Sequence, residues 1–245
     1  MSARRTFATA ARVLRQIRHD PRTIALVVVV PPLLLALIDA LLDRQPEAFA
    51  RVGAPLVGLF PFVVMFLVTS IAMLRERTTG TLERLLTLPL AKLDLLAGYG
   101  LAFGALACAQ ALVAAAVGFG ALGLDPGHGI ALVTALAVAN ALLGMALGLF
   151  VSAFARTEFQ AVQFMPAFVL PQLVMCGLFV ARAQMAGWLD GLAGALPLTY
   201  AYDALARAVS PAALGGDFAR DVAVVAGATV LALALGAATL RRTSA

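Results

Sequence analysis

Residues 130–154 read IALVTALAVANALLGMALGLFVSAF, a stretch without a single acidic or basic side chain. The hydrocarbon core of a bilayer is about 30 Å thick, and an α-helix needs about 20 apolar residues to cross it. Unpaired backbone N–H and C=O groups are costly in hydrocarbon, so an Ala- and Leu-rich run of this length is expected to be helical. We therefore predict that this stretch crosses a membrane as one helix.

Five further apolar stretches of similar length surround it. They lie at residues 24–42, 54–74, 95–122, 161–181 and 221–240. A transmembrane barrel would instead show alternating segments of about ten residues, and the sequence has none. The prediction is an all-α fold, with residues 1–245 forming one transmembrane domain of six helices.

The composition agrees with this assignment. Hydrophobic residues make up 62% of the 245 residues and charged residues only 13%, whereas soluble domains average about 25% charged residues. So little charge excludes an ordinary water-soluble domain. Cys108 and Cys176 both lie inside apolar stretches, where a free cysteine packs as a small hydrophobic residue.

The positions of arginine and lysine predict the orientation, since cytoplasmic loops carry an excess of these residues. With the N-terminus inside, 13 of the 18 basic residues fall in cytoplasmic segments and five fall outside. We expect both termini in the cytoplasm. The net charge of +5 then reflects membrane orientation and gives no support for nucleic-acid binding.

Two segments next to the spans are predicted to be amphipathic. Residues 3–20 place several arginines beside apolar side chains at helical spacing, which suits a helix lying at the membrane interface. A merely basic tail that sets topology is the alternative. Residues 182–220 contain two short apolar helical patterns, broken at Pro197 and ending at Pro211. Each is too short to span, so we expect an outer helical hairpin before the last span.

Glycines and prolines inside the spans suggest local packing features. The pairs Gly100/Gly104 and Gly144/Gly148 have the small-xxx-small spacing that lets helices approach closely. Such spacings also arise by chance in a chain rich in Gly and Ala. Prolines such as Pro166 each remove a backbone donor and favour a bend.

The segment between the second and third spans, residues 75–89, reads RERTTGTLERLLTLP. Leu82, Leu85 and Leu86 share one face of a short predicted helix, and Pro89 disfavours helical geometry at the residue before it. An exposed amphipathic helix of this kind is a docking element for a soluble partner. A connector helix lying on the membrane surface is the alternative.

The pattern Glu76-x-x-x-Gly80-Thr81-x-Glu83-x-Leu85-Leu86-x-x-Pro89 resembles the first cytoplasmic loop of ABC-2 type permeases, the membrane subunits of type V ABC exporters. The order of parts is also similar: a basic amphipathic helix, six spans with this loop after the second, and an apolar hairpin before the last. The amino-acid sequence of the loop looks most like that of the daunorubicin-resistance and nodulation-factor exporter branch.

This resemblance implies an assembly and a mechanism. Two permease chains, expected to be identical, face each other, and a separate ATP-binding subunit with ATP and Mg²⁺ docks below each one. The resemblance also implies a cell membrane, in bacteria the inner membrane. The coupling contact with the ATP-binding subunit would be formed by Glu76, Gly80, Thr81, Leu82, Glu83, Leu85, Leu86 and Pro89.

By the same resemblance, the first, second and fifth spans line the transport route. The candidate path residues are polar or aromatic side chains of the second and fifth spans: Phe66, Thr69, Ser70, Gln160, Gln163, Phe164, Phe168 and Gln172. A polar side chain in a span can equally hold two helices together.

Several chemistries have no matching residues. A phosphate-binding P-loop needs a lysine after glycine, and the only lysine is Lys92, in LPLAKL. Any ATPase must therefore be a separate chain. His19 and His128 fall on opposite predicted faces, so no nucleophile–base pair or metal site is expected, and the chain itself is not expected to be an enzyme.

Three functions remain open from the sequence. The leading one is the permease of an ATP-driven exporter for amphipathic, drug-like or lipid-like substrates. The alternatives are an ion-coupled carrier and a non-transporting membrane scaffold for a soluble partner. An ion-coupled carrier normally has buried ionisable groups. Asp221 marks the edge of the last span, and Asp39, the one acid inside a span, lies near its outer end.

Overall fold

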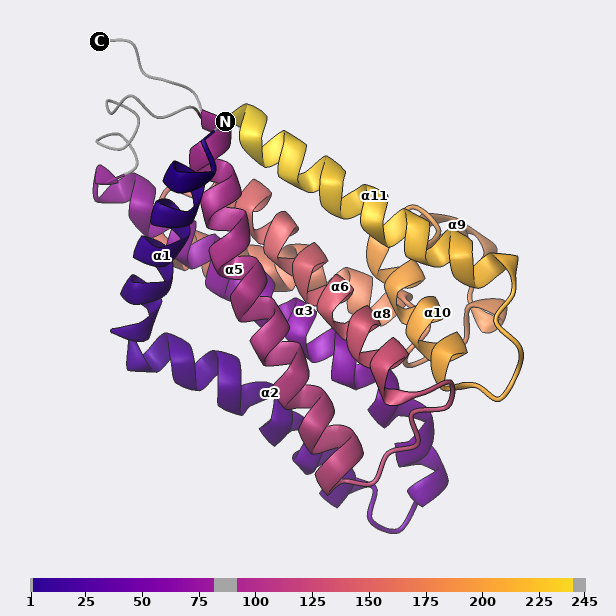
Figure 1. Cartoon of the computed structure of the whole chain (residues 1–245). Coiled ribbons are helices and arrows are strands. Elements are labelled where there is room, and N and C mark those ends of the chain that lie inside the picture. Colours follow the sequence, from indigo (N-terminus) through magenta and orange to yellow (C-terminus); the bar gives the residue numbers. More distant parts are fainter. Residues whose placement is uncertain (1, 82–91, 240–245) are drawn as a thin grey trace.

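The computed structural model describes residues 2–81 and 92–239, and within these residues every regular element is a helix (Figure 1). Five of the helices are long and apolar enough to cross a membrane, namely α2, α3, α5 with its extension, α6 and α11. The elements are α1 (Ala3–Arg18), α2 (Pro21–Leu41), α3 (Pro46–Thr78), α5 (Lys92–Ala115) extended by the π-helix η1 (Ala116–Ala121), α6 (Ile130–Val151), α7 (Glu158–Phe164), the π-helix η2 (Met165–Val169), α8 (Leu170–Met175), the 3₁₀ turn η3 (Arg182–Gln184), α9 (Gly187–Ala193), α10 (Pro197–Val209) and α11 (Gly216–Thr239).

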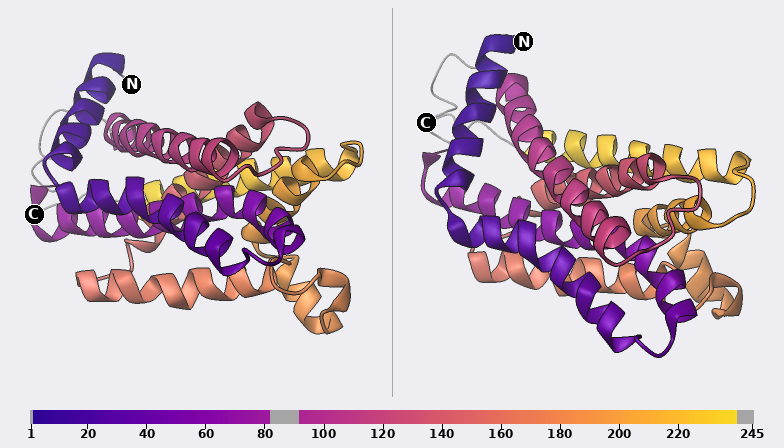
Figure 2. Two further views of the ribbon diagram at one scale, coloured as in Figure 1. Left: turned by 90° about the horizontal axis from the view of Figure 1, so that it is seen from below. Right: turned by 60° about the horizontal axis from the view of Figure 1, so that its bottom comes forward.

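The predicted span at residues 161–181 is not one long α-helix. It is divided into α7, η2 and α8, and the α-helix ends at Met175. Pro166 and Pro171 lie within this stretch. Proline lacks the backbone donor that an α-helix requires, and a π-helical turn accommodates such an interruption. Figure 2 shows this divided segment lying alongside α3.

The centre of the fold is the packing of α3 against α6. A Cβ atom added at Gly148 would lie 2.5 Å from the carbonyl oxygen of Phe66, and one added at Gly144 would collide with the carbonyl oxygen of Phe62. The close approach predicted at Gly144 and Gly148 is therefore confirmed. At Gly100 an added Cβ would meet no described atom within 4 Å, so that glycine makes no close contact within the described part of the chain.

Helix α1 forms as predicted and packs along α5. Its buried side chains, Thr6, Thr9, Ala10 and Val13, lie on one face, and a Cβ at Gly98 of α5 would lie 2.5 Å from the Cβ of Thr9. The arginines of α1 mostly remain on the exposed side, which is the arrangement that the spacing in the sequence predicts.

Two short helices, α9 and α10, lie where the hairpin was predicted. Arg182 links them, since its Nη2 lies 2.7 Å from Asp190 Oδ1 of α9 and its Nη1 lies 3.6 Å from Asp203 Oδ2 of α10. The N-terminus and the last turn of α11 lie toward the same end of the molecule, and α10 lies toward the other (Figure 1). We call these the α1 end and the α10 end.

At the α10 end, Asp221 is fully buried and accepts hydrogen bonds from Arg207 Nε at 3.0 Å and Arg220 Nη2 at 3.1 Å. We expect Asp221→Ala to lower the free energy of unfolding by about 1–3 kcal/mol, because two guanidinium groups lose a buried acceptor. Asp217→Ala is the matched control, since Asp217 contacts the same two arginines but is 62% exposed. Thermal unfolding in one detergent compares them, and equal losses would contradict this assignment.

Candidate coupling site

The last turns of α3 lead directly into the segment that resembles a coupling loop, and Glu76 holds them to α1. Glu76 is only 5% exposed, and its Oε1 lies 3.1 Å from Arg12 Nη1. Arg12 also donates from Nη2 to the hydroxyl of Tyr99 on α5 at 2.7 Å. One guanidinium thus joins three helices, because its fork of donors can serve two acceptors at once.

The preceding residue, Arg75, makes contacts with two other helices. It forms a two-pronged ion pair with Glu158 at the start of α7, with Nε–Oε1 and Nη2–Oε2 distances of 2.8 and 3.1 Å. Its Nη1 lies 3.6 Å from Asp20 Oδ2 at the start of α2. Asp20 in turn caps α2 by accepting from the backbone N–H groups of Arg22 and Thr23.

Two adjacent residues at the end of α3 therefore contact four helices. Glu76 connects to α1 and α5, and Arg75 connects to α2 and α7. The two carboxylates that contact Arg75 both have lowered pKa values. The hydrogen bond from the Thr23 hydroxyl lowers the pKa of Asp20, and the hydrogen bond from Arg75 lowers the pKa of Glu158. The end of α3 is thus held to each of these helices.

A pH titration tests the Arg75–Glu158 contact. A carboxylate with a lowered pKa contributes stability above its unfolded-state pKa of about 4, and this is lost as the pH falls through the lower folded-state value. Glu158→Gln should therefore destabilise the protein at neutral pH, and its difference from the wild type should shrink below about pH 4. Melting temperatures across this range measure it. A difference that did not depend on pH would contradict the ion pair.

After α3 the backbone turns sharply. Thr79 donates its hydroxyl to the carbonyl of Arg75 at 2.7 Å, and Gly80 has a φ of +69°. This left-handed conformation costs other residues roughly 1–2 kcal/mol. Of the predicted coupling residues, Glu76, Gly80 and Thr81 are described; Leu82, Glu83, Leu85, Leu86 and Pro89 lie outside the described residues. Gly80 thus separates α3 from the loop.

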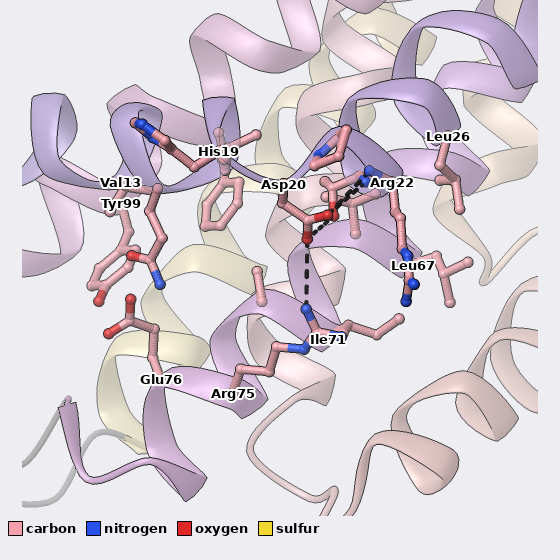
Figure 3. Close-up of a pocket in the computed structure, with 17 residues that line it drawn as sticks. Val13, His19, Asp20, Arg22, Leu26, Leu67, Ile71, Arg75, Glu76 and Tyr99 are labelled. Atoms are coloured by element: carbon pink, nitrogen blue, oxygen red, sulfur yellow. Dashed lines mark hydrogen bonds and ion pairs between the residues drawn. The ribbon is translucent and has the colours of Figure 1, made fainter.

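A cavity of about 560 Å³ lies beside these contacts, between α1, α2, α3 and α5. Figure 3 shows Asp20 and Arg75 joined across it, with Glu76 and Tyr99 at one side. The charged groups belong to the ends of helices, and the remaining lining is mainly apolar. The α1 end therefore combines a charged contact network with an open interior space.

Most of the sequence also matches the model of a known protein family. The family model described as "ABC-2 type transporter" matches residues 4–209, from the first turn of α1 to the end of α10. This chain belongs to the ABC-2 type transporter family. In this ABC-2 chain the match includes residues 75–89 and the two short helices α9 and α10.

Curated relatives of the ABC-2 chain share about a quarter of the aligned residues. The "ABC transporter G family member 20" of Dictyostelium discoideum is 27% identical over 150 residues, which are 61% of this chain and 20% of that protein. The "Probable multidrug ABC transporter permease YbhR" of Escherichia coli (strain K12) is 27% identical over 148 residues, which are 60% of this chain and 40% of that protein. The alignments thus span less than half of each relative.

The candidate path residues of the ABC-2 chain fall into two groups. Four are buried inside the chain: Phe66, Thr69, Ser70 and Gln172. Thr69 Oγ1 and the side-chain oxygen of Gln172, Oε1, have no hydrogen-bond partner in the described structure. The other four lie on α7 and η2. Gln160, Gln163 and Phe164 line a second hollow, and Phe168 is exposed. The structure does not bring the two groups together in one cavity.

Sequence reasoning missed most of the contact network at the α1 end. Asp20 could have been found, because Asp followed by Pro is a typical start of a helix. The partners of Glu76 could not, since Arg12 and Tyr99 belong to other helices, 64 residues before it in the first case. Nothing in the local pattern of the ABC-2 chain identifies these side chains as neighbours.

Proposed function

We propose that this chain is the membrane subunit of an ATP-driven exporter with six spans, in which residues 161–181 form the fifth despite its division. Family membership and the loop pattern after α3 support this proposal. Both termini would face the cytoplasm, in a bacterial inner membrane, which places the α1 end and the loop on the side where ATP is found. The position of the N-terminus and the last turn of α11 at the same end of the molecule supports an even number of spans.

The observation that carries the proposal is the network at the end of α3. A loop that received force from a partner would need firm connections to the other helices, and Arg75 and Glu76 connect α3 to α1, α2, α5 and α7. In this proposal the loop residues from Gly80 to Pro89 contact an ATP-binding subunit, which holds ATP and Mg²⁺. Glu76 acts within the chain by holding α1 to α3. The chain itself catalyses no reaction.

A second copy of the chain would complete the transport route as a homodimer. Exposed apolar side chains on α2 and on the α7–α8 segment supply a surface for it, among them Leu33, Leu37, Phe159 and Val174. The substrate class we propose is an amphipathic drug-like or lipid-like molecule, so that drug efflux and antibiotic resistance would follow. The printed name of the Escherichia coli relative, a probable multidrug permease, supports this class.

Co-purification and vesicle transport test the proposal together. The tagged chain in mild detergent should recover a P-loop ATPase in stoichiometric amount, and Glu83→Ala should weaken that recovery and uncouple ATP hydrolysis from transport. Glu47→Ala is the matched control, because Glu47 lies at the far end of α3. Recovery without any ATPase, or transport driven by an ion gradient without nucleotide, would reject the exporter and favour the scaffold or the carrier.

A further inference from the structure

The cavity at the α1 end has the size of a ligand site and a long apolar wall. Its volume of about 560 Å³ lies within the range of roughly 300–1,000 Å³ that small-molecule pockets occupy. The apolar side chains lining it from three helices are Leu26, Leu67, Val68, Ile71 and Phe103. Because it lies between helices of one chain, it is separate from a route formed between two chains.

One side of the cavity carries a buried acceptor that lacks a donor. Glu76 lines the cavity and is 5% exposed. Its Oε1 is bound to Arg12, but its Oε2 is buried and has no hydrogen-bond partner in the described structure. A buried carboxylate oxygen without a donor is unfavourable in free energy, because it has lost its hydrogen bonds to water without replacing them. A ligand that supplied an N–H or O–H group here would recover that free energy.

Another part of the rim carries a cation without a carboxylate. In Figure 3 the side chain of Arg22 extends beside Leu67, along the apolar wall. Arg75, by contrast, is already bound to Glu158 and Asp20. No described acidic side chain forms an ion pair with Arg22 within 4.0 Å. Its guanidinium is therefore available for a phosphate, which it can bind through two parallel N–H donors.

We propose that this cavity binds a phospholipid whose headgroup carries a primary ammonium. The ammonium N–H groups donate to Glu76 Oε2, the phosphate binds Arg22, and an acyl chain lies along the apolar wall. The charged groups lining the cavity, Arg22 and Arg75 against Asp20 and Glu76, are balanced, which suits a zwitterionic headgroup. A quaternary ammonium offers no N–H donor, and a glycerol headgroup lacks the cation.

This assignment makes the lipid a structural partner of the contact network. The bound headgroup would complete the hydrogen bonding of the carboxylate that joins α1 to α3. The site is distinct from the proposed transport route, and its occupancy can be measured on the purified chain without any ATPase. Its failure would therefore leave the exporter proposal untouched.

Competition binding tests the headgroup preference. The full chain in detergent is loaded with phosphatidylethanolamine labelled on its acyl chain, and unlabelled phosphatidylethanolamine, phosphatidylcholine or phosphatidylglycerol is added as competitor. We expect phosphatidylethanolamine to compete about tenfold more strongly than the other two, the effect of one charge-assisted hydrogen bond. Equal competition by the three lipids would overturn the proposal. So would equal competition by glycerophosphoethanolamine, which has the headgroup without chains.

Three variants locate the site. Glu76→Gln should abolish the preference for phosphatidylethanolamine, and Arg22→Gln should weaken phosphatidylethanolamine and phosphatidylglycerol alike. Ala72→Phe fills the cavity from α3 without removing a charge and should reduce binding about tenfold or more. Arg18→Gln is the control, because Arg18 is exposed on α1 and does not line the cavity. Unchanged binding in folded Ala72→Phe protein would overturn the proposal.

Discussion

Replacing Gly144 with alanine is expected to destabilise the protein by about 1–3 kcal/mol, the usual cost of overpacking a filled interior. The added Cβ would collide with the carbonyl oxygen of Phe62. That atom belongs to the α3 backbone, so it cannot be relieved by rotating a side chain, and α3 and α6 would have to separate. A lower melting temperature in detergent and a loss of monodisperse protein would measure the effect.

The matched control is Gly227→Ala in α11. An alanine there would meet no described atom within 4 Å, and alanine is a better helix former than glycine by about 0.5–1 kcal/mol. Gly227→Ala should therefore leave the melting temperature unchanged or raise it slightly. If Gly144→Ala behaved in the same way, the close contact between α3 and α6 would be wrong.

The second large effect is expected from Glu76→Ala in the assembled exporter. This change removes the carboxylate that accepts from Arg12, and with it the ion pair between α1 and the end of α3. Coupling changes within a protein are commonly about 0.5–2 kcal/mol, which corresponds to about 2- to 30-fold in transport per ATP hydrolysed. We expect ATP hydrolysis to persist while transport falls by this factor. Reconstituted vesicles with parallel phosphate-release and uptake assays make the measurement.

A companion variant separates coupling from folding. Arg12→Gln breaks the same contact from the other side, so it should show the same transport defect, and the double variant should be no worse than either single one. Glu47→Ala should behave as the wild type. Normal transport in Glu76→Ala would show that the contact between α1 and α3 carries no coupling.

Much of the helical architecture was predictable because it depends on hydropathy and helix length. Five of the six predicted spans correspond to long apolar helices, and the hairpin helices begin and end close to Pro197 and Pro211 as expected. The division of residues 161–181 was signalled by Pro166 and Pro171, but proline indicates a bend without specifying its geometry. A π-helical turn depends on the packing of neighbouring helices, which the local sequence does not encode.

The candidate site was predictable only in part, for a different reason. The loop pattern identified the end of α3, and Gly80 has the left-handed conformation that favours glycine. The connections of that end depend on contacts between distant helices. Glu76 was expected to face a partner subunit, yet it is buried against Arg12 of its own chain. The burial of Glu76 follows from how α1 lies on α5, and the composition of the sequence gives no sign of it.

The tight crossing of α3 and α6 is the point about which α3 would pivot. The prolines within α3 are Pro55 and Pro61, both before the crossing at Phe62 and Phe66. The arm from Phe62 to Thr78 is an uninterrupted helix of about 25 Å at 1.5 Å per residue. A push on the loop beyond Thr78 would therefore rotate a stiff arm about the two glycines. The opposite arm, softened at its prolines, would absorb the motion as bending.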